Sequence, residues 1–168
     1  ILEQQGDLQN ARSEFEQLVK NRPNDPAARF QLGRIYLDSG DGAAAAEHFS
    51  RLLESDPENV QALRSLAQAY NSQGEAELAD ECFRRLTELD PDEVDFHMDL
   101  ALFLQERGRS AEAEAEVRRY LGGHPENADA RILLGRRIFR QERYDEALTH
   151  FRAILEDHPD NAQAYYYL

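Results

Sequence analysis

Residues 26–59 read PAARFQLGRIYLDSGDGAAAAEHFSRLLESDPEN, and this pattern recurs along the chain with a spacing of 34 residues. Its most regular sign is a ladder of prolines: Pro23, Pro57, Pro91, Pro125 and Pro159. Further columns with the same spacing begin at Ala11, Phe15 and Leu32. A fixed period over a whole chain is typical of a repeat array, in which each unit packs on its neighbours.

Each repeat is predicted to contain two helices, which makes the fold all-α. In the first whole repeat, Leu32, Ile35 and Tyr36 show the three- and four-residue spacing of an amphipathic helix. Pro57 ends the second helix because proline cannot continue one, and Asn59 is placed to cap the next. The predicted divisions are 1–25 (partial repeat), 26–59, 60–93, 94–127 and 128–161 (whole repeats), and 162–168 (start of a further repeat).

Three positions suggest local departures from the pattern. Gly6 and Asp7 are predicted to form a turn between two helices. Gly122 and Gly123 are predicted to end their helix early, because glycine favours a left-handed cap and costs about 1 kcal/mol in a helix interior. Glu142 stands where other repeats have a turn glycine, so a left-handed backbone there would cost on the order of 1 kcal/mol.

The chain has 168 residues and a formal net charge of −14. An acidic chain without a dense Lys/Arg stripe repels a phosphate backbone, so we expect no nucleic-acid partner. No apolar run approaches the ~18 residues of a membrane span, and Ile1 does not begin a signal peptide. We therefore expect no direct membrane insertion, while the compartment, cytoplasmic or periplasmic, stays open.

Residue usage adds two smaller points. Cys82 is the single cysteine, which excludes an intrachain disulfide. Lys20 is the single lysine among many arginines, a bias that favours a GC-rich bacterial genome. Because the first and last residues fall inside repeats, we expect this sequence to be a fragment of a longer array.

In these columns the chain resembles the tetratricopeptide repeat family over residues 1–168. The resemblance rests on the period, the turn glycines, the Ala and Phe of the second helix, the closing proline and a column of small residues. The small column consists of Gly33, Ala67, Ala101 and Gly135. The resemblance implies a right-handed superhelical solenoid of antiparallel helix pairs, whose concave wall, lined by each first helix, holds a protein or peptide partner.

From that resemblance we derive a candidate peptide-binding groove. Its residues are Phe30, Arg34, Arg64, Gln68, Met98, Leu102, Ile132, Leu133, Arg136, Phe139, Arg140 and Tyr166. Apolar groups gathered on one wall indicate a groove, and Arg136 and Arg140 would match an acidic residue of the partner. Two other interpretations stay open: a helix outside this sequence covers the wall, or some of these side chains are interhelical core. Arg34, Arg64 and Gln68 either make polar contacts or are solvated surface.

The chaperone adaptors of this family hold peptide carboxylates with Lys, Asn, Asn, Lys and Arg from three successive repeats. The matching positions here include Asp95 and Asp99, or Asp99 and Asp129, so carboxylates would repel the ligand. We therefore exclude that type of site.

Catalytic and metal sites are also not expected. His48, Cys82 and His150 share one column, but neighbouring repeats are separated by helices at roughly 8–10 Å each. Their side chains cannot converge on a metal ion at about 2.0–2.3 Å. Nothing in the sequence orients a base toward Cys82, and no phosphate-binding glycine motif is present, so we expect no cofactor.

The sequence predicts a protein–protein interaction scaffold that binds a peptide or helix and has no catalysis of its own. The alternative is a recognition arm of a larger enzyme, such as a glycosyltransferase or protease, with its active site elsewhere. Self-association through uncapped ends is a third interpretation, since such ends expose an apolar face.

Overall fold

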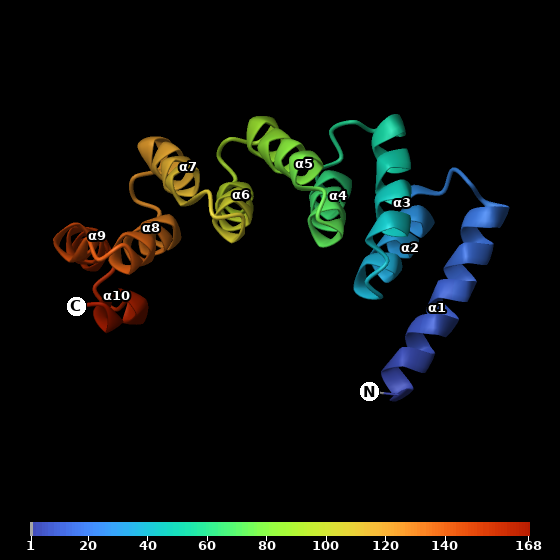
Figure 1. Cartoon of the computed structure of the whole chain (residues 1–168), viewed down its shortest axis with the longest axis horizontal. Helices are drawn as coiled ribbons and strands as arrows, with labels where there is room; N and C mark the ends of the chain where they lie inside the picture. The colour runs from blue at the N-terminus through green and yellow to red at the C-terminus, as the bar shows by residue number, and fades with distance from the viewer. Residues whose placement is uncertain (1) are drawn as a thin grey trace. The chain divides into compact units, whose positions relative to one another are not determined.

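The computed structural model describes residues 2–168 and the side chains of residues 9–168. Within this described part the chain forms ten α-helices and no strand, which confirms the all-α fold class (Figure 1). The helices are α1 (Leu2–Asn21), α2 (Pro26–Asp38), α3 (Gly42–Ser55), α4 (Val60–Gln73), α5 (Ala76–Leu89), α6 (Val94–Glu106), α7 (Ser110–Gly123), α8 (Ala128–Arg140), α9 (Tyr144–Asp157) and α10 (Ala162–Tyr166).

The chain divides into two compact units, Ile1–Leu89 and Asp90–Leu168. In the first unit α1 packs on α2, α2 on α3, α3 on α4 and α4 on α5. In the second, α6 packs on α7, α7 on α8, α8 on α9 and α9 on α10. Within each unit, each helix therefore packs against the next helix in the sequence, as expected for a solenoid.

The small-residue column has the structural role expected of it. A Cβ atom added at Gly33 would lie 2.8 Å from Cε1 of Phe49, and one added at Gly135 would lie 2.9 Å from Cε1 of Phe151. Both phenylalanines have no exposed surface. The paired helices thus approach so closely that the ring of the second helix fills the space above a glycine of the first.

The predicted helix cap is confirmed at Asn59. Its side-chain Oδ1 accepts a hydrogen bond from the backbone N–H of Ala62 at 2.9 Å. Asn127 caps α8 and Asn161 caps α10 in the same way, with N···O distances of 3.0 and 2.9 Å. These bonds satisfy backbone donors that the first helical turn leaves unpaired.

The left-handed turn at Glu142 is also confirmed. Gly40, Gly74 and Gly108 have φ values of 82°, 81° and 75°, and Glu142 at the equivalent position has φ 65°. Glu142 is the single non-glycine residue with positive φ in the described part of the chain.

Two predicted helix breaks are wrong. Helix α1 runs from Leu2 to Asn21 without a turn at Gly6 and Asp7, because one glycine costs a helix only about 1 kcal/mol. Helix α7 continues to Gly123, so Gly122 does not end it.

Packing around Tyr120 explains the continuation of α7. The Tyr120 ring is 5% exposed and lies between the rings of His97 and His124, at centroid distances of 5.0 and 4.7 Å. The backbone N–H of His124 then closes the last turn on the carbonyl of Tyr120 at 3.1 Å. This packing outweighs the weak preference of glycine for a cap.

Candidate functional site

The first helix of each repeat carries the predicted groove residues, and each unit brings some of them together. In the first unit, Phe30 and Arg34 of α2 line a cavity of about 440 Å³ together with Gln31 and Gln61. Phe30 is half-buried against Phe49, with ring centroids 5.6 Å apart.

The other two predicted residues of this unit do not line that cavity. Arg64 is half-buried and Gln68 is exposed, both on α4. Helix α4 instead contributes Gln61, one turn closer to its N-terminus, to the cavity of Phe30 and Arg34.

In the second unit, Arg136 of α8 and Tyr166 of α10 line a cavity of about 250 Å³ with Gln163 and Tyr167. Tyr166 is 82% exposed. The Nε atom of Arg136 is buried and has no hydrogen-bond partner among the described residues. This cavity therefore combines an aromatic surface with a guanidinium group that has unused donors.

The ring of Tyr167 holds the α10 side of this cavity in place. It stacks on Phe151 of α9 with centroids 4.7 Å apart and an interplanar angle of 8°. Phe139 of α8 packs edge-on against Tyr167 at 5.6 Å and against Tyr144 at 5.0 Å. Phe139 is half-buried and does not line the cavity, but it contacts Tyr167, which does.

Other predicted residues of this unit lie outside the cavity. Leu102 of α6 is 55% exposed, and Arg140 of α8 is exposed as well. Met98 and Leu133 are half-buried.

Ile132 does not belong to a groove. It is only 5% exposed and is part of the core. Phe30, Arg64 and Met98 occupy the same repeat position and are half-buried, so this position lies at the edge of the helix interface. At such an edge the depth of a side chain depends on its local packing, so Ile132 is buried while Phe30, Arg64 and Met98 keep part of their surface exposed.

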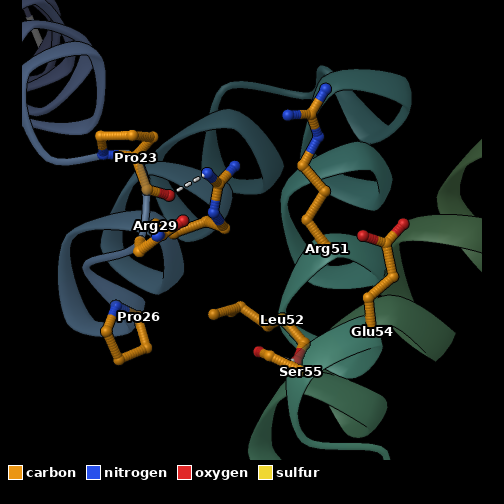
Figure 2. Close-up of a pocket in the computed structure, with 8 residues that line it drawn as sticks. Pro23, Pro26, Arg29, Arg51, Leu52, Glu54 and Ser55 are labelled. Atoms are coloured by element: carbon orange, nitrogen blue, oxygen red, sulfur yellow. Dashed lines mark hydrogen bonds between the residues drawn. The ribbon is translucent and has the colours of Figure 1, made fainter.

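Arg29 and a second cavity in the first unit were not predicted from the sequence. Arg29 of α2 is 9% exposed, and its Nη2 donates to the backbone carbonyl of Pro23. It lines a cavity of about 340 Å³ between the loop before α2 and the last turns of α3 (Figure 2). The available signal was that the basic residues Arg29, His97 and Arg131 share one position of the first helix.

A buried hydrogen bond between His97 and Glu116 in the second unit was also not predicted from the sequence. His97 Nδ1 lies 2.6 Å from Glu116 Oε1, and its Nε2 lies 3.0 Å from the carbonyl oxygen of Pro91. Arg119 also donates to Glu116, at 2.7 Å. Burial raises the pKa of the Glu116 carboxyl, but the hydrogen bonds from His97 and Arg119 outweigh it and hold the pKa below its usual value.

The structure gives no support to chemistry at the cysteine or at a metal. Burial raises the pKa of the Cys82 thiol to about 11, so the nucleophilic thiolate is scarcely populated near neutral pH. Among the residues whose placement is described, no group of three or more His, Cys, Asp and Glu side chains is arranged to hold a metal ion. The same part of the chain contains no helix that is long and apolar enough to cross a bilayer.

Comparison with known proteins identifies the repeat. Two family models described as tetratricopeptide repeat match the chain, one at residues 1–54 and 72–128 and the other at residues 36–98 and 104–168. The chain belongs to the tetratricopeptide repeat family. Repeats of this family generally form protein-interaction scaffolds, and the search of curated proteins found no match.

Solved tetratricopeptide structures share the fold. A crystal structure of MamA has a TM-score of 0.74 and 22% sequence identity, covering 96% of this chain and 94% of MamA. TTC0263, a protein of Thermus thermophilus, has a TM-score of 0.60 and 24% identity over 98% of this chain and 90% of its own. YrrB, described as having an unusual peptide-binding site, has a TM-score of 0.61 and 19% identity over 91% of this chain and 79% of its own.

Proposed function

We propose that this chain is a protein-interaction scaffold that binds a peptide on the first-helix wall of its second unit, the surface formed by α6, α8 and α10. The observation that carries the proposal is the cavity in which Arg136 and Tyr166 meet. Neither Arg136 nor Arg140 forms an ion pair with another described residue. Their charges are therefore available to a partner.

The chemistry of the wall specifies the peptide. Tyr166 and Leu102 are 82% and 55% exposed, and both offer apolar surface that a partner side chain would remove from water. The guanidinium of Arg136 offers planar donors to a carboxylate. The matching segment has an Asp or Glu next to an aromatic or aliphatic residue. The peptide-binding site for which YrrB is described supports a peptide as the class of ligand.

Selection from a random peptide library tests this proposal. We expect selected peptides to combine an acidic residue with a neighbouring aromatic or aliphatic one. Binding is then measured by fluorescence anisotropy on wild type and on a Leu102→Glu, Tyr166→Glu double variant. Both residues are exposed, so the substitutions do not disturb the core. Loss of these two exposed apolar contacts should lower affinity by about tenfold or more.

Leu78→Glu is the matched control, because Leu78 is 41% exposed but lies on α5 in the first unit. We expect it to bind like wild type. If the selected peptides bind the double variant normally, the wall of the second unit is not the site. Light scattering on all three proteins shows whether self-association changes the signal.

A further inference from the structure

The fourth position of the first helix holds a basic residue in three of the four whole repeats, so its partners can be compared between repeats. In the last whole repeat this residue is Arg131, whose Nη1 bonds to Asp157 Oδ2 at 2.8 Å and to the carbonyl of Ala153 at 3.3 Å. In the repeat before it this position holds His97, whose Nδ1 lies 2.6 Å from Oε1 of Glu116. In both repeats a carboxylate of the same repeat partners the basic side chain.

Arg29 occupies this position in the first whole repeat and has no such partner. Ser55 stands in the place of Asp157, and His48 stands in the place of Glu116. Beyond the bond from Nη2 to the carbonyl of Pro23, the guanidinium of Arg29 makes no hydrogen bond or ion pair with a described residue.

The remaining repeat is apolar at the matching positions. Leu63 replaces the cation and Leu89 stands in the place of Asp157. At these two positions the fourth whole repeat therefore has both a cation and a carboxylate, and the second whole repeat has neither. In the first whole repeat the cation is present, and the place of the carboxylate borders a cavity.

That cavity has room for a ligand group. It has a volume of about 340 Å³ and is lined by Arg29, Ser55, Leu52 and two prolines, among others. Figure 2 shows the Arg29 side chain reaching from α2 toward the space in front of α3, with Arg51 beyond it on α3. Glu54 also lines the cavity, but it forms no ion pair with Arg29 among the described residues.

Arg51 does not supply the missing anion, since it is itself a cation. It is exposed at the rim, where its Nη2 bonds to Glu47 at 2.9 Å. The cavity therefore has a fixed, largely buried guanidinium at its base and a second guanidinium at its edge. Planar, charge-assisted pairing makes such a base selective for carboxylates.

We propose that the cavity between the loop before α2 and the end of α3 is a binding site for the carboxylate of an aspartate or glutamate in a partner peptide. The carboxylate takes the place that Asp157 has in the last repeat and pairs with the free Nε and Nη1 donors of Arg29. Leu52 and the proline rings contact the aliphatic part of the ligand residue. This site is separate from the wall of the second unit, so either can fail without the other.

His48 supplies an independent reporter of occupancy. Burial lowers the pKa of its imidazole, and the positive charge of Arg29 lowers it further. A carboxylate paired with Arg29 offsets that charge, so the pKa of His48 rises when the site is filled. Glu47 and Glu16 raise the pKa of His48, whereas Arg29 and Arg51 lower it. The same four residues are present with and without the peptide, so a change in this pKa on titration reports the added carboxylate.

The test is an NMR titration of the whole chain with the capped tripeptides Ac-Leu-Asp-Leu-NH₂ and Ac-Leu-Asn-Leu-NH₂ at equal ionic strength. We expect the aspartate peptide to shift the Nε–Hε signal of Arg29 saturably and to raise the pKa of His48. The asparagine peptide, which lacks only the charge, should bind about tenfold more weakly. The Nε–Hε signal of Arg131, already paired with Asp157, serves as the control and should not move.

Two variants complete the test. In Arg29→Met the peptide should no longer raise the pKa of His48, and circular dichroism checks that the fold is intact. Ser55→Asp places an internal carboxylate where Asp157 lies in the last repeat, so it should raise the pKa of His48 without ligand and block the peptide. Equal responses to both peptides, or an unchanged response in Ser55→Asp, would overturn the proposal. A stronger response to inorganic sulfate than to the aspartate peptide would overturn it in favour of an oxyanion site.

Discussion

Replacing Glu142 with glycine should stabilise the protein, and the four helix-pair turns allow this gain to be worked out. At Glu142 the backbone N–H bonds to the carbonyl of Phe139 at 3.0 Å, and the next N–H bonds to Ile138 at 3.3 Å. Gly108 has the same pair of bonds, to Gln105 at 3.0 Å and from Arg109 to Leu104 at 2.8 Å. The same motif is therefore closed by glycine in one repeat and by glutamate in another.

The magnitude follows from the left-handed backbone. A side chain at φ 65° costs about 1–2 kcal/mol, because Cβ crowds the following carbonyl oxygen. Glycine removes this cost but gives back about 0.4–1 kcal/mol, because it makes the unfolded chain more flexible. Glu142 is exposed, and no described residue bonds to its side chain, so no contact is lost. The net gain for Glu142→Gly is about 1 kcal/mol.

Urea unfolding followed by circular dichroism measures this gain. With a slope of about 2 kcal/mol per molar urea, the midpoint should rise by about 0.5 M. Gly108→Glu is the matched reverse variant. Nothing lies within 4 Å of a Cβ at Gly108, so its cost of about 1 kcal/mol would be purely conformational. If Gly108→Glu costs nothing, or Glu142→Gly destabilises, the left-handed turn does not carry the strain that we assign to it.

Three further predictions follow from the core and its buried groups. Gly33→Ala should lower the free energy of unfolding by about 1–2 kcal/mol, because the new methyl group overlaps the Phe49 ring. In a double-mutant cycle followed by urea melts, the same change should cost less in a Phe49→Val background, where the ring is absent. Cys82, with its pKa raised to about 11, should react with a thiol reagent at pH 8 only after urea unfolds the chain, and fast labelling of the native protein would contradict its burial. Burial lowers the pKa of His48 and His150 in the folded chain, so the unfolded chain takes up protons first as the pH falls. The free energy of unfolding should therefore decrease below about pH 6.5. The double His→Gln variant should lose this dependence when urea melts at pH 5.5 and 7.5 are compared.

Most of the fold could be predicted from the sequence because every position is sampled several times. A single Ala or Pro is weak evidence for local structure, but columns such as those beginning at Ala11 and Pro23 repeat the same evidence in each unit. The two wrong helix breaks come from glycines judged singly, at Gly6 and at Gly122. Their preference of about 1 kcal/mol is smaller than the packing of one buried ring such as Tyr120.

The candidate site was less predictable, because periodicity tells which face of a helix a residue occupies but not how deep its side chain lies. Ile132 and Arg64 share a repeat position, yet Ile132 is core and Arg64 is half-buried. The meeting of Arg136 with Tyr166 depends on how α10 rests against α8 and α9, through rings such as Tyr167. That contact joins side chains of two different repeats and cannot be derived from either helix alone.

In a repeat array, a residue that departs from the pattern can be compared with the residues at the same position in the other repeats. The comparison separates departures that only change stability from those that suggest a binding site. Glu142 departs at an exposed turn for about 1 kcal/mol and touches nothing, so it calls for no ligand. Arg29 departs differently, since the residue is 9% exposed and, among the described residues, its guanidinium bonds only to the carbonyl of Pro23, with no carboxylate to balance its charge. The later repeats supply those partners at Glu116 and Asp157, whereas the first whole repeat has an open cavity in the matching place. The departure at Arg29 therefore leaves a charged side chain beside an open cavity, and a partner carboxylate is the simplest group that balances the charge.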